Sequence, residues 1–353
     1  KEPPGVAGFA KRFNEYLDSD EAAIGRLKQF GFWANIWGSP SSAIVNLIQT
    51  PTITAAQIAG WGGGRAWVDV NKLMGSVSTA IRADTKEGAK VDFDRIKFRS
   101  DTERADFMAA VKSGLIDPTV AQELQGDERS TFGPSKQTRD FLGRVFKVGA
   151  SMFNTAEQVN RAVAWLAAYR AIQNPSSRNK FMRMYAKDKR VQALLNQGRD
   201  TPADVARFVV EDTQFIGGKF DRPEALRGLG GVAFQFKQYP LNYMRILWGN
   251  FKRLGPEGRT AGLIMITTMM ALSGLLGLPF AEDVLNFADA IGKFATKVDP
   301  MLERELRNFI GDPGWAETIL RGPSRAVTGV DLSKRFGVGE IAPEADLLLS
   351  IPI

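Results

Sequence analysis

The sequence predicts an all-α protein: an irregular assembly of many helices, with one long amphipathic helix and one or two hydrophobic helices. Period-two alternation of polar and apolar residues is rare, so signs of strands are few. Helix starts recur instead, in which a capping residue precedes a proline whose fixed φ suits the first turn. These pairs are Ser39–Pro40, Asp117–Pro118, Thr201–Pro202, Asp299–Pro300 and Asp312–Pro313.

Composition changes divide the chain into four expected segments. Residues 86–106 mix acids and bases with few apolar positions, which is typical of a solvated connector. After Asp312, frequent glycine and proline favour short helices and turns laid on the surface. The segments are N-terminal helices with an uncharged, Trp-rich hairpin (1–85), a charged connector with short helices (86–133), the main helical domain (134–300) and a Gly/Pro-rich C-terminal extension (301–353).

The clearest single element is a long helix from about Ser135 to Ala171. Apolar residues recur there at spacings of three and four, which places a stripe roughly 50 Å long on one face. Small residues at Gly149 and Ala156 would admit a close neighbour, so the stripe fits a core helix, which we favour, or an oligomer seam. The stripe is Leu142, Val145, Gly149, Met152, Ala156, Val159, Val163 and Leu166.

Two stretches lack Asp, Glu, Lys and Arg altogether, from Gln29 to Gly64 and from Thr260 to Ala281. As a helix the second would extend about 33 Å, close to the roughly 30 Å hydrocarbon thickness of a bilayer. Contact with a membrane at some stage, a permanent single-pass anchor and a buried core helix all stay open, although Pro279 argues against an uninterrupted span. Small residues for close helix packing are Gly262, Ser273, Gly274 and Gly277.

The first uncharged stretch is less like a span. Pro40 and Pro51 are expected to divide it into helices of about ten residues, which fits a hairpin. Its tryptophans suit a water–lipid boundary or a packed helix junction equally well. Across both stretches and the helix before the second, the candidates for membrane contact are Trp33, Trp37, Trp61, Trp248, Leu263, Ile264, Ile266, Met269, Leu272, Leu275, Leu276, Leu278 and Phe280.

Two basic stretches are candidates for binding phosphates. Residues 225–256 hold no acid and alternate cations with aromatic rings, which suits nucleic acid, an interfacial helix or a core helix with solvated cations. Residues 178–190 lie on a predicted helix after Asn174–Pro175, either as a solvated face or as a phosphate-binding stripe. The phosphate or lipid-headgroup candidates are Arg178, Lys180, Arg183, Lys187, Lys189, Arg190, Lys237, Arg245, Lys252, Arg253 and Arg259.

Composition restricts the possible chemistry. The 353 residues are 44% apolar, which allows a real core, and contain no cysteine and no histidine. Disulfides, thiolate or imidazole metal ligands, a Cys nucleophile and a Ser-His triad are therefore excluded, although carboxylate-only metal sites remain possible. The net charge of +7 weakly favours anionic partners such as phosphate backbones or acidic lipid.

No enzyme is predicted. The carboxylate pairs stand in polar contexts that would not raise a pKa into a catalytic range, and Ser177-Arg-Asn-Lys180 lacks the companion motifs of Ser-x-x-Lys chemistry. We expect no catalytic or metal site, no cofactor and no small-molecule substrate. The carboxylate pairs are Asp92/Asp94, Glu282/Asp283 and Glu303/Glu305.

Four short motifs occur in a fixed order. They are Ser39-Pro-Ser-Ser-Ala-Ile-Val-Asn-Leu-Ile-Gln49, Phe234-Gln-Phe-Lys-Gln-Tyr-Pro240, Gly274-Leu-Leu-Gly-Leu-Pro-Phe-Ala-Glu-Asp283 and Gly329-Val-Asp-Leu-Ser-Lys-Arg-Phe-Gly-Val-Gly339. In this order they resemble a helical domain of large polyvalent and internal virion proteins of tailed, especially short-tailed, bacteriophages. The resemblance covers the chain from about residue 39 to 340.

The resemblance implies a non-enzymatic module of a very large protein that is stored in the virion interior and ejected with the genome. Such proteins help to form a conduit for DNA across the host cell envelope. Implied partners are other copies of the chain, other virion proteins, phage DNA and host membrane lipid. The alternative is a DNA-binding or packing scaffold within the virion that never meets a membrane. Since the chain begins at Lys1 without Met or a signal core, we also expect a longer parent protein.

Overall fold

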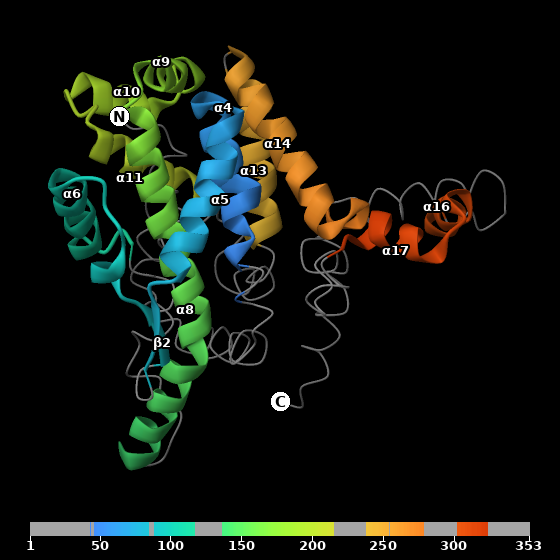
Figure 1. The fold of residues 1–353 in the computed structure, drawn as a ribbon, viewed down its shortest axis with the longest axis horizontal. Helices are drawn as coiled ribbons and strands as arrows, with labels where there is room; N and C mark the ends of the chain where they lie inside the picture. Colours follow the sequence, from blue (N-terminus) through green and yellow to red (C-terminus); the bar gives the residue numbers. More distant parts are fainter. Residues whose placement is uncertain are drawn as a thin grey trace, which may run out of the picture.

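The computed structural model describes residues 43, 46–84, 88–116, 136–214, 238–253, 255–278 and 302–323. These residues confirm the all-α prediction, with one two-stranded sheet in addition (Figure 1). The elements are η1 (Thr50–Thr54), α4 (Ala55–Gly62), α5 (Gly64–Ser78), β1 (Ile81–Asp84), β2 (Gly88–Val91), η2 (Phe93–Arg95), α6 (Asp101–Lys112), α8 (Lys136–Ile172), α9 (Pro175–Met184), α10 (Lys189–Asn196), α11 (Pro202–Thr213), α13 (Gln238–Lys252), α14 (Gly255–Ser273), η6 (Leu275–Gly277), α16 (Leu302–Ile310) and α17 (Pro313–Arg321).

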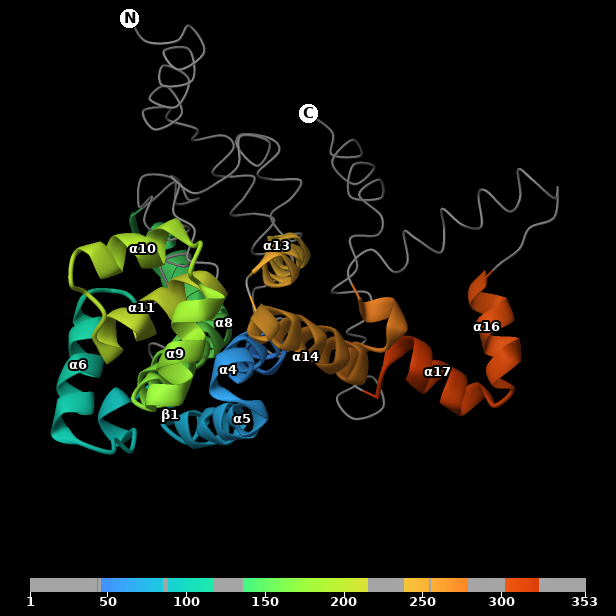
Figure 2. The same cartoon turned by 90° about the horizontal axis from the view of Figure 1, so that it is seen from above.

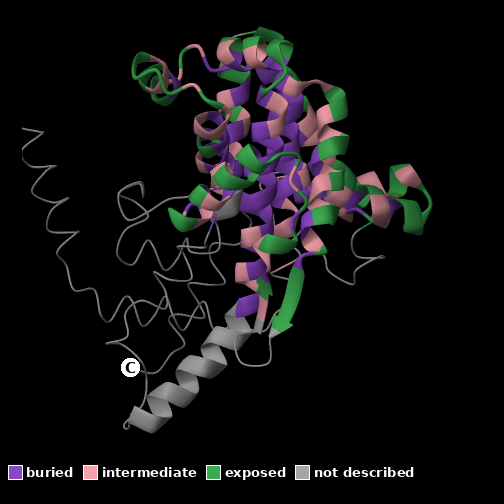
Figure 3. Cartoon of the chain, turned by 60° about the vertical axis from the view of Figure 1, so that its left-hand side comes forward, coloured by how far each residue is buried: buried purple, intermediate pink, exposed green. Residues whose placement is uncertain are grey.

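The predicted long helix is α8, which carries the core of the fold. α5, α11 and β2 pack against it, and its C-terminal half is buried on every side rather than along one stripe (Figure 3). Val159 and Val163 of the predicted stripe are buried, but Met152 is exposed, and Trp165 is buried outside the stripe. This half of α8 is therefore a core helix, while the side chains of residues 136–150 lie outside the described part.

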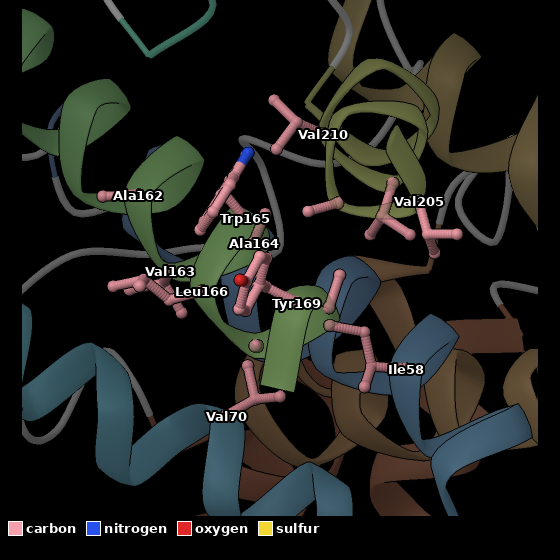
Figure 4. Packing of buried hydrophobic residues seen from close by; sticks show 14 of the residues in the cluster. Ile58, Val70, Ala162, Val163, Ala164, Trp165, Leu166, Tyr169, Val205 and Val210 are labelled. Atoms are coloured by element: carbon pink, nitrogen blue, oxygen red, sulfur yellow. The ribbon is translucent and has the colours of Figure 1, made fainter. Parts of the chain in front are cut away.

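Aromatic rings fix the helices around α8. Trp165 stacks on Tyr169 with ring centroids 4.8 Å apart and meets Phe107 of α6 edge-on at 5.5 Å. Figure 4 shows α8 side chains beside Ile58 of α4 and Val205 of α11. Close aromatic pairs add to the free energy of burial, so the Phe107–Trp165 pair anchors α6 to α8, while α4 and α11 pack on α8 within the same hydrophobic core.

Pro51 does not divide the first uncharged stretch as predicted. The backbone stays helical through it because η1 is a π-helix, in which the Ala55 N–H reaches the Thr50 carbonyl. Proline lacks an N–H and crowds the preceding turn, and the wider π-turn accommodates both effects. From Ile53 to Trp61 the run is buried, so its lack of charge is explained by the core.

The segment expected to be a solvated connector is folded. β1 and β2 form an antiparallel hairpin, and α8 side chains cover the outer edge of β2. α6 follows, with Phe107 fully buried against α8. The hydrogen bonds across that edge run from Ala89 N–H to Ser151 Oγ (3.2 Å), from Thr155 Oγ1 to the Ala89 carbonyl (2.7 Å) and from Val91 N–H to Gln158 Oε1 (3.2 Å).

Two of the five predicted helix starts lie in the described part, and both are confirmed. Thr201 caps α11 by accepting from the Asp204 N–H, and Asp312 caps α17 by accepting from the Trp315 N–H. The starts at Ser39, Asp117 and Asp299 lie outside the described residues.

α14 packs on α4 and α13, and it leads to a projecting pair, α16 and α17 (Figure 2). The contact with α4 is close at Gly60, where an added Cβ would lie 2.6 Å from the Glu257 carbonyl oxygen. α17 meets the end of α14 where the Gly274 and Gly322 backbones touch. The two uncharged stretches of the sequence therefore lie against each other, through α4 and α14.

Candidate functional site

The second uncharged stretch does not form one helix across residues 260–281. α14 ends at Ser273, because Gly274 adopts φ 70° and ψ −175°, a conformation that only glycine takes easily. In the part of the chain that the structure describes, no helix is long and apolar enough to span a bilayer.

α14 has one face in the core and one face in solvent. Met265 and Met269 are buried beneath α13 and η1, whereas Leu263 is 58% exposed and Met270 is 41% exposed. The exposed positions after Arg259 carry no charge, unlike the usual solvent side of a surface helix. We call this surface the outer face of α14; it consists of Thr260, Leu263, Thr267, Met270 and Ala271.

α13 extends this apolar exposure. Trp248 is 63% exposed, and Phe251 is exposed over α14, where a Cβ on Gly262 would lie 3.1 Å from its ring. The exposed apolar side chains of both helices thus belong to one packed helix pair. Exposed apolar groups gathered in this way mark interaction surfaces more often than scattered ones do.

Several predicted membrane-contact residues do not lie on this surface. Trp61 is in the core, edge-on to Phe181 at 5.4 Å, and Met269 and Leu276 are buried as well. These three side chains serve packing, because apolar residues in a helical protein fill its core first. Partly buried are Ile264, Ile266, Leu272, Leu275 and Leu278, and outside the described residues are Trp33, Trp37 and Phe280.

The two predicted basic stretches meet at one cavity of about 320 Å³. The junction of α9 and α10 forms one wall, α13 forms the other, and Asp212 of α11 lies between them. The lining holds five cations and two carboxylates. We call it the cationic pocket; its residues are Met184, Tyr185, Lys187, Asp188, Arg190, Asp212, Arg245, Ile246, Gly249, Lys252 and Arg253.

Asp212 organises the pocket. Arg190 Nη2 donates to Asp212 Oδ1 at 2.7 Å, and Arg253 Nη2 donates to Oδ2 at 3.0 Å. The Tyr185 hydroxyl lies 3.3 Å from Oδ2, and the Arg253 guanidinium stacks 4.3 Å from the Tyr185 ring centroid. Arg253 also donates to Gln57 Oε1 at 2.9 Å, so the pocket is tied to α4 as well.

The electrostatics agree with this geometry. Burial by itself raises the pKa of Asp212, but the charges of Arg253 and Arg190 and the Arg190 hydrogen bond hold that pKa below its ordinary value. Burial also raises the pKa of the Tyr185 hydroxyl. Asp212 is therefore ionised and Tyr185 protonated at neutral pH, and both arginines have a fixed counter-charge.

Three other cations of the pocket form no ion pair with a carboxylate among the described residues, although the charge of Arg245 helps to lower the pKa of Asp212. Lys187 and Arg245 are exposed at the rim, and Lys252 Nζ lies 4.9 Å from the Trp248 ring centroid. Asp188 is already engaged by Arg190, at 3.1 Å. Among the described residues the pocket therefore carries an excess of positive charge, with five cations against two carboxylates.

The remaining predicted cations do not line the pocket. Arg178 pairs with Asp200 and Arg183 with Glu257, while Lys180, Lys189 and Arg259 lie at partly or fully exposed positions. Lys237 lies outside the described residues. The sequence prediction missed Asp212, since an acid on an ordinary helix carries no local signal of burial.

Three carboxylates of the predicted pairs are engaged in ion pairs. Asp92 binds Arg82 at 2.9 Å, and Asp94 binds Arg104 at 3.0 Å. Glu303 binds Arg307 at 2.7 Å, and Glu282/Asp283 lie outside the described residues. The described part of the chain contains no group of three or more acidic residues placed to hold a metal ion.

Comparison of the chain with family models, with curated proteins and with solved structures finds no match.

Proposed function

We propose that the chain is a non-enzymatic structural module of a phage internal virion protein, ejected with the genome, that helps to form a conduit for DNA across the host cell envelope. Its working partners are further copies of the chain, other virion proteins and host membrane lipid. The resemblance of the four ordered motifs supports the virion assignment. The observation that carries the membrane contact is the outer face of α14, which is exposed and yet free of charge.

The physical argument concerns the cost of leaving apolar groups in water. Each exposed apolar side chain forgoes about 25 cal/mol per Å² of area that could be buried. Leu263 and Met270 on α14, with Trp248 on α13, would bury that area at a lipid surface. Arg245 and Lys252 beside Trp248 would at the same time meet anionic headgroups, the usual arrangement of an interfacial helix.

Liposome flotation at low and high salt tests the proposal. Lipid association that survives high salt is expected, because apolar contact is not screened by ions. Leu263→Asp should abolish that association, while Val68→Asp, which adds the same charge at an exposed apolar position of α5, should not. A folded Leu263→Asp variant that floats like the unaltered chain would refute the membrane contact. Met265 is unsuitable for this test because it is fully buried, so its substitution would report on folding.

The second candidate is the DNA-binding or packing scaffold without membrane contact, which the cationic pocket favours. It predicts no flotation at any salt concentration. It also predicts DNA binding whose affinity falls steeply as salt rises, because counterions are released on binding. The same preparation can be used for both assays.

A further inference from the structure

We propose that the cationic pocket binds a single phosphate group, and that its ligand is the phosphate-bearing headgroup of an anionic membrane lipid. This inference rests on the proposed membrane contact and adds a ligand class and a defined site to it. The site consists of a preformed floor, made by Asp212, Arg190 and Arg253, and a cationic rim, made by Lys187, Arg245 and Lys252.

The charge balance of the pocket points to an anion. Five cations face two carboxylates across the cavity, and both carboxylates are already bound by Arg190. The rim cations form no ion pair with a carboxylate in the described part of the chain, so their like charges converge on one space. A cleft with an excess of one sign of charge concentrates ions of the opposite sign. Lysine and arginine are the side chains that bind phosphate oxygens best.

The floor of the pocket is held in place before any ligand arrives. Asp212 is 3% exposed and receives both arginines, and Arg253 is fixed further by its stacking on Tyr185. A cavity of about 320 Å³ lies in the range of roughly 300–1,000 Å³ typical of small-molecule sites. Since the pocket is preorganised, binding a headgroup would cost little further ordering of the protein.

The surroundings favour a lipid over a nucleic acid. Lys252 lines the pocket and contacts the ring of Trp248, so the cationic and the exposed apolar surfaces adjoin at these two residues. A lipid matches this arrangement, because its phosphate lies next to its apolar chains. Tryptophan is enriched at that boundary of a membrane. A nucleic acid needs a groove that follows successive phosphates, whereas Lys187, Arg245 and Lys252 border a single cavity.

The first experiment is calorimetric titration of the whole chain with glycerol 3-phosphate, a soluble mimic of the headgroup. Saturable binding is expected, weakened at least about tenfold in Lys187→Gln and in Arg245→Gln, because each loses a charge-assisted contact. Lys72→Gln and Arg65→Gln remove exposed α5 cations outside the pocket and should bind like the unaltered chain. Equal affinity in all four variants would overturn the site.

A steric variant separates the pocket from net charge. Gly249 lies inside α13 and lines the cavity, and a Cβ built there meets nothing within 4 Å. Gly249→Leu therefore fills the space while keeping every cation, and it should abolish glycerol 3-phosphate binding with unchanged helicity by circular dichroism. Undiminished binding in folded Gly249→Leu would place the anion elsewhere and overturn the proposal.

The second experiment uses vesicles of phosphatidylcholine that contain either phosphatidylglycerol or the same fraction of oleate, an anion without phosphate. Preference for phosphatidylglycerol is expected, and Arg245→Gln should lose that preference while still floating at high salt. If Leu263→Asp stops all flotation while glycerol 3-phosphate still binds, both proposals stand.

The remaining outcomes separate the two proposals. Flotation without headgroup preference would overturn the pocket and leave the membrane contact. Phosphate binding without any flotation would overturn both the lipid source and the membrane contact. Binding to DNA alone, with a steep salt dependence, would assign the pocket to a nucleic acid and overturn the lipid ligand.

Discussion

Replacing Asp212 by Asn tests whether this carboxylate holds the pocket and the adjoining helices together. Asp212 is 3% exposed and binds Arg190 at 2.7 Å and Arg253 at 3.0 Å, and the Arg253 side chain is itself only 15% exposed. Removing one partner of a buried ion pair leaves the other charge uncompensated, which costs about 3–5 kcal/mol. Because a domain is stable by only about 5–15 kcal/mol, this single change should remove a large fraction of the free energy of unfolding.

The assay is urea unfolding followed by circular dichroism, with Asp94→Asn as the matched control. Asp94 binds Arg104 at the same 3.0 Å, but it is 70% exposed, so its loss should cost less than about 1 kcal/mol. Asp212→Asn should therefore lower the midpoint much further than the control. If the free energies of unfolding of the two variants differ by less than about 1 kcal/mol, the Asp212 carboxylate does not compensate a buried arginine charge. Asp212 would then not hold the pocket floor together.

The same substitution has a pH signature. The native pKa of Asp212 is lowered, so its contribution to stability is present above the unfolded value, about 3.9, and is lost as pH falls through the native pKa. Stability of the unaltered chain should therefore fall more steeply below about pH 4 than that of Asp212→Asn. Parallel acid profiles for the two proteins would contradict the lowered pKa.

Two further predictions concern the core. Gly60→Ala places a Cβ 2.6 Å from the Glu257 carbonyl oxygen and should lower the free energy of unfolding by about 1–3 kcal/mol. In Gly75→Ala on α5 the added Cβ meets nothing within 4 Å, so this change should raise that free energy by about 0.5–1 kcal/mol. Shifts of the same sign for both variants in urea unfolding would contradict the close contact at Gly60. Burial and a hydrogen bond to Asp106 raise the pKa of Tyr169 to about 12. In an ultraviolet titration, Tyr169→Phe should therefore remove a tyrosine ionisation near pH 12. If the ionisation that disappears lies near pH 10 instead, the raised pKa of Tyr169 is refuted.

Local signals in the sequence were sufficient for the helices and insufficient for the hairpin. The start and end of α8 follow from apolar spacing alone, because helical hydrogen bonds join near neighbours. β1 and β2 are four residues each, and β2 depends on α8 side chains some sixty positions away, such as Ser151 and Thr155. No short-range pattern in the sequence contains that dependence. The sequence therefore predicted a charged connector for this segment.

The sequence predicted cations of the pocket, but not that they would lie together in one site. Arg190 and Arg253 stood among the phosphate candidates, in two stretches interpreted separately. What joins them is Asp212, which lies 22 positions from Arg190 and 41 from Arg253 along the chain. The burial of a carboxylate depends on which helices surround it, and only the tertiary packing of α9, α11 and α13 supplies that information.

Burial accounts for the lack of charge at residues 53–61 of the first uncharged stretch, but for only one face of α14 in the second. Residues 53–61 have no charge because a charge in the core would lack water and a partner. Met265 and Met269 of α14 obey the same rule, but Leu263, Thr267 and Met270 do not, since an Asp or Lys there would face solvent at little cost. Burial therefore leaves the lack of charge on one face of α14 unexplained. A charge on that face would be costly if the face contacted an apolar partner such as lipid.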